Sequence, residues 1–255
     1  MSTLSDVEFR SILNFVWARV RALRQPRPRL QDVTCFCATS VRIPRAVETL
    51  RLCAELCEFD EIVLATHERI PASQAAFARV VPVHRIEDRR WYSHLILDEL
   101  KKIIRTEYVL VVQDDGFILN PGAWDDAFYD CDYVGAPWPP TLTIEPPGLV
   151  LKLENRVGNG GFSLRSRRLL EACSFNTLFR PEYGLMMEDL LIGHFNYRQL
   201  AEKGIRFAVC ARCFFAIQKQ IRRYEKQYQK RSGRVTEFKA ALHGGNIVVS
   251  EVGKY

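Results

Sequence analysis

Polar residues that suit metal and phosphate chemistry follow one strongly apolar run of the chain. Residues 109–112 are all apolar, and Gln113, Asp114, Asp115 and Gly116 come directly after them. Carboxylates placed just beyond a buried strand suit Mg²⁺ or Mn²⁺, which proteins hold through few carboxylates together with substrate phosphate oxygens. A polar turn whose aspartate caps the next segment has the same composition. Taken alone, this pattern leaves both interpretations open.

A glycine-rich segment lies further along, at residues 157–166 (Val-Gly-Asn-Gly-Gly-Phe-Ser-Leu-Arg-Ser). Gly158, Gly160 and Gly161 would let the backbone of a loop approach a ligand closely, although tight turns need the same residues. Ser166 resembles the N-cap of a following helix. The segment matches neither a dinucleotide fingerprint nor a P-loop.

Two further features carry titratable groups. Glu188 and Asp189 directly precede an apolar helix, whose N-terminus could hold a carboxylate ionised and ready to accept a proton. A plain acidic helix start is the simpler alternative. His243 lies in a Leu-His-Gly-Gly-Asn turn, and neutral imidazole is a good metal ligand, although isolated surface histidines are commoner than metal-binding ones.

The elements expected to position these residues alternate between strands and helices. Apolar runs predict strands at 33–38, 61–66, 80–83, 108–112, 132–136, 149–153 and 162–164; helical spacing predicts helices at 4–24, 44–57, 71–79, 91–105, 166–173 and 189–203. This alternation indicates an α/β fold with a mostly parallel central sheet and helices on both faces. Ligands of such sheets bind at the carboxyl ends of the strands, where strand order reverses. Loops after Ala38, Thr66, Val83 and Val112 are therefore where a nucleotide would lie.

In combination these motifs resemble GT-A glycosyltransferases. The shared order is a D-x-D type metal motif after a strand, a glycine-rich loop, an x-E-D motif at a helix start and a C-terminal histidine. More narrowly, Gln113-x-Asp115, residues 134–138 (Val-Gly-Ala-Pro-Trp) and residues 157–166 resemble a little-characterised family of glycosyltransferase-like proteins. The resemblance extends from about residue 33 to 246 and implies a GT-A, Rossmann-like fold.

The resemblance also implies roles. Asp115 and His243 would hold Mn²⁺ or Mg²⁺ against the donor diphosphate, with Gln113 where the motif has its first aspartate and Asp114 at the variable position. Asp189 would be the general base of an inverting transfer, and Glu188 would position either the acceptor or that base. The remaining implied donor-site residues are Thr39, Ser40, Arg42, Gly160 and Gly161. Arg42 could contact the phosphates or be a solvated loop residue, and these readings have equal weight.

Composition sets wider bounds. The chain has 255 residues, 47% hydrophobic and 26% charged, with a net charge of +6. We expect a basic N-terminal helix and linker at 1–30, the transferase domain at 31–246 and a tail at 247–255. No apolar stretch is long enough for a membrane span and no signal peptide is visible, so we expect a cytoplasmic protein with its eight cysteines reduced. Helix 4–24 could pack on protein, mediate homo-oligomerisation or lie on the inner face of a membrane.

The expected partners are a nucleotide-sugar donor and a glycan, lipid-linked or other hydroxyl acceptor, with a role in surface glycan or polysaccharide synthesis. Two alternatives remain. A nucleotidyltransferase would share the sheet and the metal, but residues 38–45 lack the glycine-rich loop that such enzymes carry after the first strand. A non-catalytic carbohydrate-binding protein would not need the acids at 115 and 189. Nucleic acid is not an expected partner, because no recognisable binding motif accompanies the basic ends.

Overall fold

The computed structural model describes residues 27–114, 116–118, 121–144, 149–153, 155, 157–179 and 187–209. In this part of the chain the central element is a seven-stranded sheet of order β3-β2-β1-β4-β8-β5-β9. Its strands are β1 (Arg29–Ala38), β2 (Glu58–Thr66), β3 (Arg79–Pro82), β4 (Tyr108–Val112), β5 (Tyr133–Pro137), β8 (Val157–Ser166) and β9 (Phe207–Val209). β1 to β4 run parallel, β8 runs antiparallel to β4 and β5, and β9 is parallel to β5.

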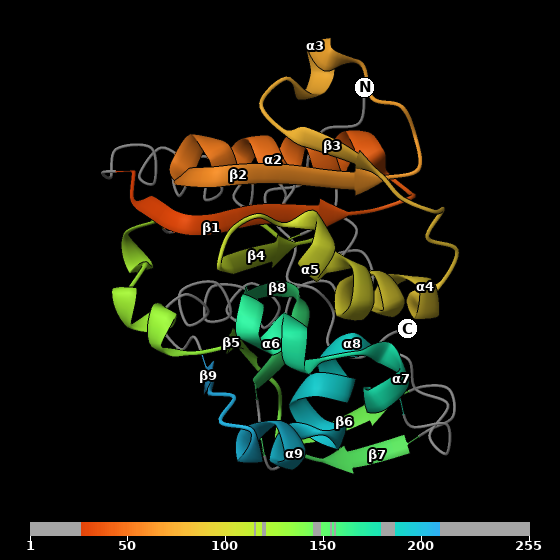
Figure 1. Ribbon diagram of the computed structural model, residues 1–255, viewed down its shortest axis with the longest axis vertical. Helices are drawn as coiled ribbons and strands as arrows, with labels where there is room; N and C mark the ends of the chain where they lie inside the picture. The colour runs from red at the N-terminus through yellow and green to blue at the C-terminus, as the bar shows by residue number, and fades with distance from the viewer. Residues whose placement is uncertain are drawn as a thin grey trace, which may run out of the picture.

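Helices cover both faces of the sheet (Figure 1). One face carries α2 (Ile43–Leu56). The other carries a continuous helical segment made of α4 (Arg89–His94), the π-helical turn η1 (Leu95–Glu99) and α5 (Leu100–Ile103). β1 alternates between these layers, because Cys35 packs with α2 whereas Phe36 packs with Leu95 and Leu100. The predicted fold class, a mostly parallel α/β sheet with helices on both faces, is therefore confirmed.

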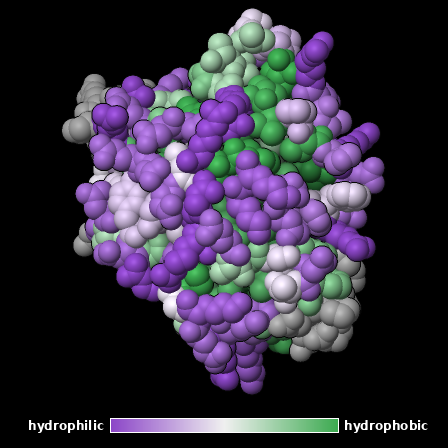
Figure 2. Space-filling view, in the orientation of Figure 1, coloured by the Kyte–Doolittle hydropathy of each residue, from purple (hydrophilic) through white to green (hydrophobic). Residues whose placement is uncertain are grey.

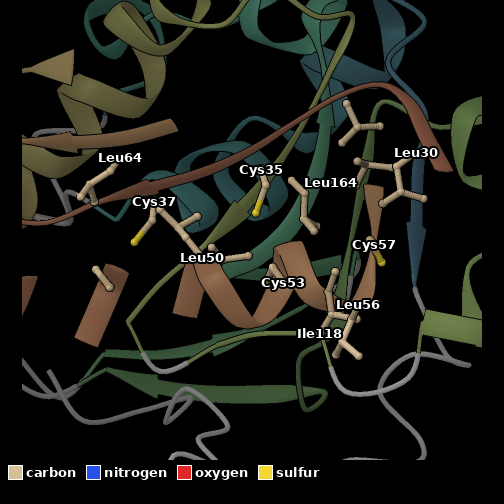
Figure 3. Close-up of a cluster of buried hydrophobic side chains, with 14 of the residues drawn as sticks. Leu30, Cys35, Cys37, Leu50, Cys53, Leu56, Cys57, Leu64, Ile118 and Leu164 are labelled. Atoms are coloured by element: carbon tan, nitrogen blue, oxygen red, sulfur yellow. The ribbon is translucent and has the colours of Figure 1, made fainter. Parts of the chain in front are cut away.

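The cysteines of this region belong to the core. Figure 3 shows Cys35, Cys37, Cys53 and Cys57 among leucines between β1 and α2. All six cysteines of the described residues are free, and only Cys131 among them is not fully buried. Burial raises the pKa of the Cys57 thiol to about 12, so this group stays protonated and unreactive at neutral pH. Five of these six are buried, as expected of core residues, whereas Cys210 and Cys213 lie outside the described residues.

The second half of the chain packs around the far end of the sheet. Its helical elements are α6 (Arg167–Ala172), α7 (Phe175–Leu178), α8 (Glu188–Leu190), the π-helical turn η5 (Leu191–Phe195) and α9 (Tyr197–Glu202). A separate hairpin of β6 (Thr141–Ile144) and β7 (Leu149–Lys152) packs through Leu142 and Leu151 on Trp138 and Leu190. Smaller pieces are α3 (Ala72–Ala75) and the 3₁₀ turns η2 (Pro121–Ala123) and η3 (Asp126–Asp130).

Several sequence predictions need correction. The strand predicted at 162–164 is confirmed but longer: the glycines before it form not a loop but the first part of the ten-residue strand β8, because both its neighbours supply backbone partners. The helix predicted at 189–203 is interrupted at Asn196, whose buried side-chain amide donates to the carbonyls of Leu178 and Leu191. Strands β6 and β9 were not predicted, and the helix at 71–79 is only one turn long. The helix predicted at 4–24 lies outside the described residues.

The order of the strands fixes where a ligand crevice must open. From β1 the chain passes through α2 to β2 on one side, and from β3 it crosses back through α4–α5 to β4 on the other side of β1. The loops after β1 and β4 therefore diverge at neighbouring strand ends, which is the topological switch point of an open α/β sheet.

The face shown in Figure 2 is largely hydrophilic, with hydrophobic residues gathered in its upper part, where β2 and β3 lie. Within the described residues, no helix combines the length and apolar character needed to cross a bilayer.

Asp132 joins three parts of the second half. Its carboxylate accepts hydrogen bonds from the Ser166 hydroxyl (2.7 Å) at the start of α6 and from the backbone N–H of Arg206 (2.8 Å) just before β9. Its side chain also lies 3.2 Å from the guanidinium of Arg168, and the residue is only 5% exposed. One buried carboxylate therefore holds β5, α6 and β9 together.

Replacing Asp132 by alanine should lower the free energy of unfolding by about 1–3 kcal/mol, because it removes the acceptor of the buried Ser166 hydroxyl and of the part-buried Arg206 N–H. Thermal or urea unfolding measures this loss. The matched control is Asp130→Ala, an exposed aspartate two positions earlier, which should change stability by no more than about 0.5 kcal/mol. Equal effects of the two substitutions would contradict the junction.

Candidate functional site

The strand ends on either side of the switch point are joined by an ion pair. Arg42 follows β1 and Asp114 follows β4, and their Nε and Oδ2 atoms lie 2.9 Å apart. Thr49 of α2 donates from its hydroxyl to the backbone carbonyl of Asp114 (3.2 Å), which holds the loop after β4 against the helix. Arg42 itself caps α2 in the left-handed region at φ 51°. Backbone strain of this kind clusters at functional sites. The strained residue nevertheless begins the helix, because the carbonyl of Arg42 accepts from the N–H of Ala46.

Thr39 and Ser40 brace the loop after β1. The Thr39 hydroxyl donates to the carbonyl of Val41 (2.6 Å), and the Ser40 hydroxyl accepts from the N–H of Ile86 (2.7 Å) in the segment after β3. Both residues are buried, so their hydroxyls are engaged within the protein. Any contribution they make to a donor site depends on the shape of the loop they hold.

The loop after β4 also touches the glycine-rich strand. Val112, the last residue of β4, pairs with Phe162 of β8, and Gly116 lies against the carbonyl of Gly161. Gln113 starts the loop, and its side chain lies beside the buried Tyr92 hydroxyl and lowers the pKa of that phenol, although burial of Tyr92 raises it more. The D-x-D type motif and the glycine-rich segment are therefore neighbours in space.

Strand β8 bulges where its glycines lie. In the ladder with β5, Gly135 pairs with Ser163 but the next residue, Ala136, pairs with Gly158. Residues 159–162 are thus extra on β8, and a bulge of this kind bends a strand and redirects its backbone groups. The N–H of Gly160 points out of the ladder and donates to Asp189 Oδ2 (3.0 Å). This bond brings β8 and α8 together 29 residues apart in sequence.

The absence of a side chain at Gly160 is necessary for this contact. A Cβ atom there would overlap Glu188 Oε1 and approach Arg165 Nη2 to 2.9 Å. The glycine is therefore required by the two charged groups packed against its backbone.

Beneath the bulge lies a buried ion pair. Arg165 is 0% exposed and Glu188 is 5% exposed, and Arg165 Nη2 lies 2.8 Å from Glu188 Oε1. The guanidinium also donates through Nε to the Ser163 hydroxyl (3.0 Å) and stacks over the Tyr133 ring at 5.2 Å from its centroid. Burial alone would lower the pKa of Arg165, but Tyr133 and Glu188 outweigh it and raise the pKa, so the guanidinium is charged.

The carboxyl group of Asp189 has an altered affinity for protons. Its Oδ2 accepts from Gly160 N–H and its Oδ1 from Leu190 N–H (2.8 Å). Burial raises its pKa to about 6, with a further increase from the negative charge of Glu188, and the two N–H donors and Arg165 oppose the rise. A carboxylate of this kind is ionised at neutral pH yet more basic than an ordinary aspartate.

The structure brings together most, but not all, of the predicted site. One group lies at the ends of β1 and β4: Thr39, Ser40, Arg42, Gln113 and Asp114. A second group lies beside it, where β8 meets α8: Gly160, Gly161, Glu188 and Asp189. Asp115 and His243 lie outside the described residues. Within the described ranges no three of the side chains that commonly bind metals are grouped as a metal site.

Sequence reasoning missed Arg165, Tyr133 and Tyr92. Arg165 was visible as a charged residue inside the otherwise small and apolar run Phe-Ser-Leu-Arg-Ser, a position where a strand buried on both faces has no room for solvent. The two tyrosines lie in ordinary apolar segments, and nothing in the sequence distinguishes them from core residues.

Comparison with known families gives one clear result. A model described as "Protein of unknown function (DUF5672)" matches residues 76–232, more than half of the chain. The chain belongs to this family. Its description assigns no activity. The match begins within the segment between α3 and β3, so β1, α2 and β2 lie outside it.

Other similarities of this DUF5672 member are distant. Adenylate cyclase 2 of Rhizobium meliloti (strain 1021) is 42% identical over 52 residues, which cover 20% of this chain and only 14% of the cyclase. A mannosyltransferase of Pyrobaculum calidifontis solved with GDP-Man and Mn²⁺ is 16% identical, with 94% of this chain and 77% of that chain covered and a TM-score of 0.43.

The glucosyl-3-phosphoglycerate synthase of Mycobacterium tuberculosis solved with Mn²⁺, UDP and phosphoglyceric acid is 15% identical, with 78% and 72% covered and a TM-score of 0.42. With TM-scores below 0.5, these structural similarities do not by themselves assign an activity to this chain.

Asp189→Asn should gain stability relative to the wild type as the pH rises from 4 to 7.5. Because the folded state binds this proton more tightly than the unfolded chain, ionisation of Asp189 costs stability as the pH rises from 3.8, its ordinary pKa, through about 6. The neutral amide avoids that cost at every pH, but it keeps only one acceptor oxygen for the two N–H groups. The difference in stability between variant and wild type should therefore change in favour of the variant between pH 4 and pH 7.5, by at most about 3 kcal/mol.

Melting curves of both proteins between pH 4 and pH 8 measure the effect. Asp130→Asn, at an exposed position, serves as the control and should follow the wild type throughout. A difference in stability between Asp189→Asn and the wild type that stays constant from pH 4 to pH 8 would contradict the raised pKa of Asp189.

Proposed function

We propose that this chain is a metal-dependent GT-A glycosyltransferase that moves a sugar from a nucleotide-sugar donor to an acceptor hydroxyl with inversion of the anomeric centre. The observation that carries the proposal is Asp189, a carboxylate with a pKa raised to about 6, held by two backbone N–H groups beside the switch-point crevice. An inverting transfer needs one general base at this kind of position, because the acceptor hydroxyl must lose its proton as it attacks.

The chemistry of Asp189 fits that role. Each oxygen already accepts one backbone hydrogen bond, which leaves a second lone pair on each for an acceptor hydroxyl. The raised pKa makes the carboxylate a stronger base than an exposed aspartate while it remains ionised at pH 7–8. In this proposal Glu188 does not contact the acceptor, because it is buried against Arg165, and it acts on Asp189 instead.

The donor would lie along the ends of β1 and β4. The loop braced by Thr39 and Ser40 would line the base and ribose, and Arg42 would turn from Asp114 towards the diphosphate. Arg42 is half-exposed, so it is free to make that change. Gly160 and Gly161 would form the wall where donor sugar and acceptor meet.

Asp115 and His243 are the proposed protein ligands of Mn²⁺ or Mg²⁺, with Gln113 beside them in place of a second carboxylate. The position of Asp115, one residue beyond Asp114 at the end of β4, supports this assignment; His243 is assigned from the sequence motif alone. When bound, the ion neutralises charge that grows on the leaving diphosphate.

A nucleotide-sugar panel tests the proposal. Purified full-length protein is incubated with UDP- and GDP-sugars and Mn²⁺, with and without EDTA, and thermal shift and release of nucleoside diphosphate are measured. We expect one nucleotide family to stabilise the protein only when the metal is present. Release should increase with pH along a limb centred near pH 6, because Asp189 must be ionised to act as base.

Asp189→Asn should lower turnover by about 10²- to 10⁴-fold while leaving metal-dependent donor binding intact, as expected for loss of a general base. Asp115→Asn should instead weaken the metal-dependent shift. Glu171→Gln, at an exposed position on α6, is the matched control and should behave as wild type. Full donor binding with no turnover in the wild-type protein would favour the non-catalytic alternative, and no response to any donor would sink the proposal.

A further inference from the structure

Arg165 is fully buried and contacts several groups of the bulge in β8. It pairs with Glu188 through Nη2, and the same nitrogen lies 3.4 Å from the carbonyl oxygen of Gly160. Its Nε donates to the Ser163 hydroxyl, which in turn donates to that same carbonyl (3.2 Å). Two of its nitrogens thus act on the carbonyl of Gly160, one directly and one through Ser163, and the N–H of the same residue, in the preceding peptide group, donates to Asp189.

Such an arrangement is expensive to build. Burying an ion pair removes the hydration of both charges, and their mutual attraction only partly offsets that loss of free energy. In addition, Nη1 of Arg165 is buried with no hydrogen-bond partner within the described structure. Apolar side chains would fill the same space at lower cost. What they could not do is place a positive charge and a fixed backbone amide next to one carboxylate in a region of low dielectric constant.

The groups around Asp189 divide into charged and neutral ones. Glu188 of α8 raises its pKa and Arg165 of β8 lowers it, whereas the N–H groups of Gly160 and Leu190 stabilise the ionised form. Tyr133 of β5 interacts with Asp189 and Tyr92 of α4 with Glu188, but burial raises the pKa of both phenols, so they stay neutral. Among the described residues, the charged groups that act on Asp189 are therefore Arg165 and Glu188.

We propose that Arg165 is the positioning residue of this site: through Glu188 and the backbone of Gly160 it sets both the orientation and the charge state of Asp189. The inference rests on the proposed function for its catalytic meaning, since it gives Asp189 the properties of a general base. Its physical content, the control of one carboxylate by one buried guanidinium, does not depend on any substrate.

The test compares two variants that both lack the Glu188 charge, Glu188→Gln and the double variant Glu188→Gln/Arg165→Met. In this background only Asp189 of the acidic pair titrates, so its midpoint is not shared between coupled groups. The Asp189 carboxyl signal is followed by ¹³C NMR of full-length protein labelled at aspartate side chains, and Asp189→Asn identifies the signal.

We expect the midpoint of Asp189 to be about one pH unit higher in the double variant than in Glu188→Gln, because one stabilising positive charge has gone. Glu188→Gln itself should titrate below the wild type. The double variant carries no unpaired buried charge from this pair, so it should remain folded even if Arg165→Met alone does not.

The matched control is Arg167→Met, in the Glu188→Gln background as well. Arg167 lies two residues further along and anchors the carbonyls of Lys101, Ile104 and Thr106, so its loss should lower stability without moving the Asp189 midpoint. Equal midpoints in all three Glu188→Gln proteins, or an equal shift in the Arg167→Met control, would overturn the inference.

Turnover of whichever donor is active separates this inference from the proposed function. Glu188→Gln/Arg165→Met should turn over more slowly than Glu188→Gln and move the acid limb of the pH profile upward, whereas Arg167→Met in the same background should leave the limb in place. If the wild type turns over no donor but the midpoint still moves with Arg165, the transferase proposal fails and the control of Asp189 by Arg165 stands. If turnover occurs but neither midpoint nor limb responds to Arg165, the reverse holds.

Discussion

The second half of the molecule is organised around a charge pair that water cannot reach. Arg165 and Glu188 come from a strand and from a one-turn helix, and their contact at 2.8 Å requires those two elements to meet at one distance and angle. Removal of either group would leave the other as an unpaired buried charge, which strongly destabilises a folded protein. The position of α8 relative to β8 is therefore constrained by this ion pair together with the apolar contacts of Leu190 and Leu191.

The glycines follow from this pair. A side chain at Gly160 would collide with both charged groups, so the backbone must come close there, and the bulge in β8 gives that backbone a free N–H to offer. That N–H then fixes Asp189. A residue type usually associated with loop flexibility serves here to make a strand approach a charged cluster, which explains why a segment with three glycines is ordered as a ten-residue strand.

The two halves of the site use different physics. Around the ends of β1 and β4 the contacts are half-exposed and exchangeable, as in the pair between Arg42 and Asp114, where a ligand phosphate could replace the carboxylate. Around Asp189 they are part-buried and come from fixed backbone N–H groups. A division between an adaptable donor side and a rigid base suits a transferase, in which the donor must bind and leave while the base keeps one geometry.

The sequence by itself determined the layers of the fold and the list of candidate acids. Strand–helix alternation is a local signal, and it was sufficient to predict β1, α2, β4 and the Ser166 N-cap, whose hydroxyl accepts from the N–H of Leu169. It also placed polar residues at strand ends, where parallel sheets bind ligands. Spacing predicted residues 162–164 as a strand but could not show that β8 extends back through the glycines, because its pairing partners lie on β4 and β5, far from the glycines in sequence.

Only the tertiary structure decided which acid is fixed and which is neutralised. Glu188 and Asp189 are adjacent in the chain, yet Glu188 forms an ion pair with Arg165, whereas Asp189 accepts from the N–H of Gly160 and has a raised pKa. No local pattern distinguishes them, because burial and the distance to a charge 23 residues away are properties of the folded chain. Composition and periodicity select the elements of a protein, whereas the proton affinity of a single carboxylate depends on what those elements enclose.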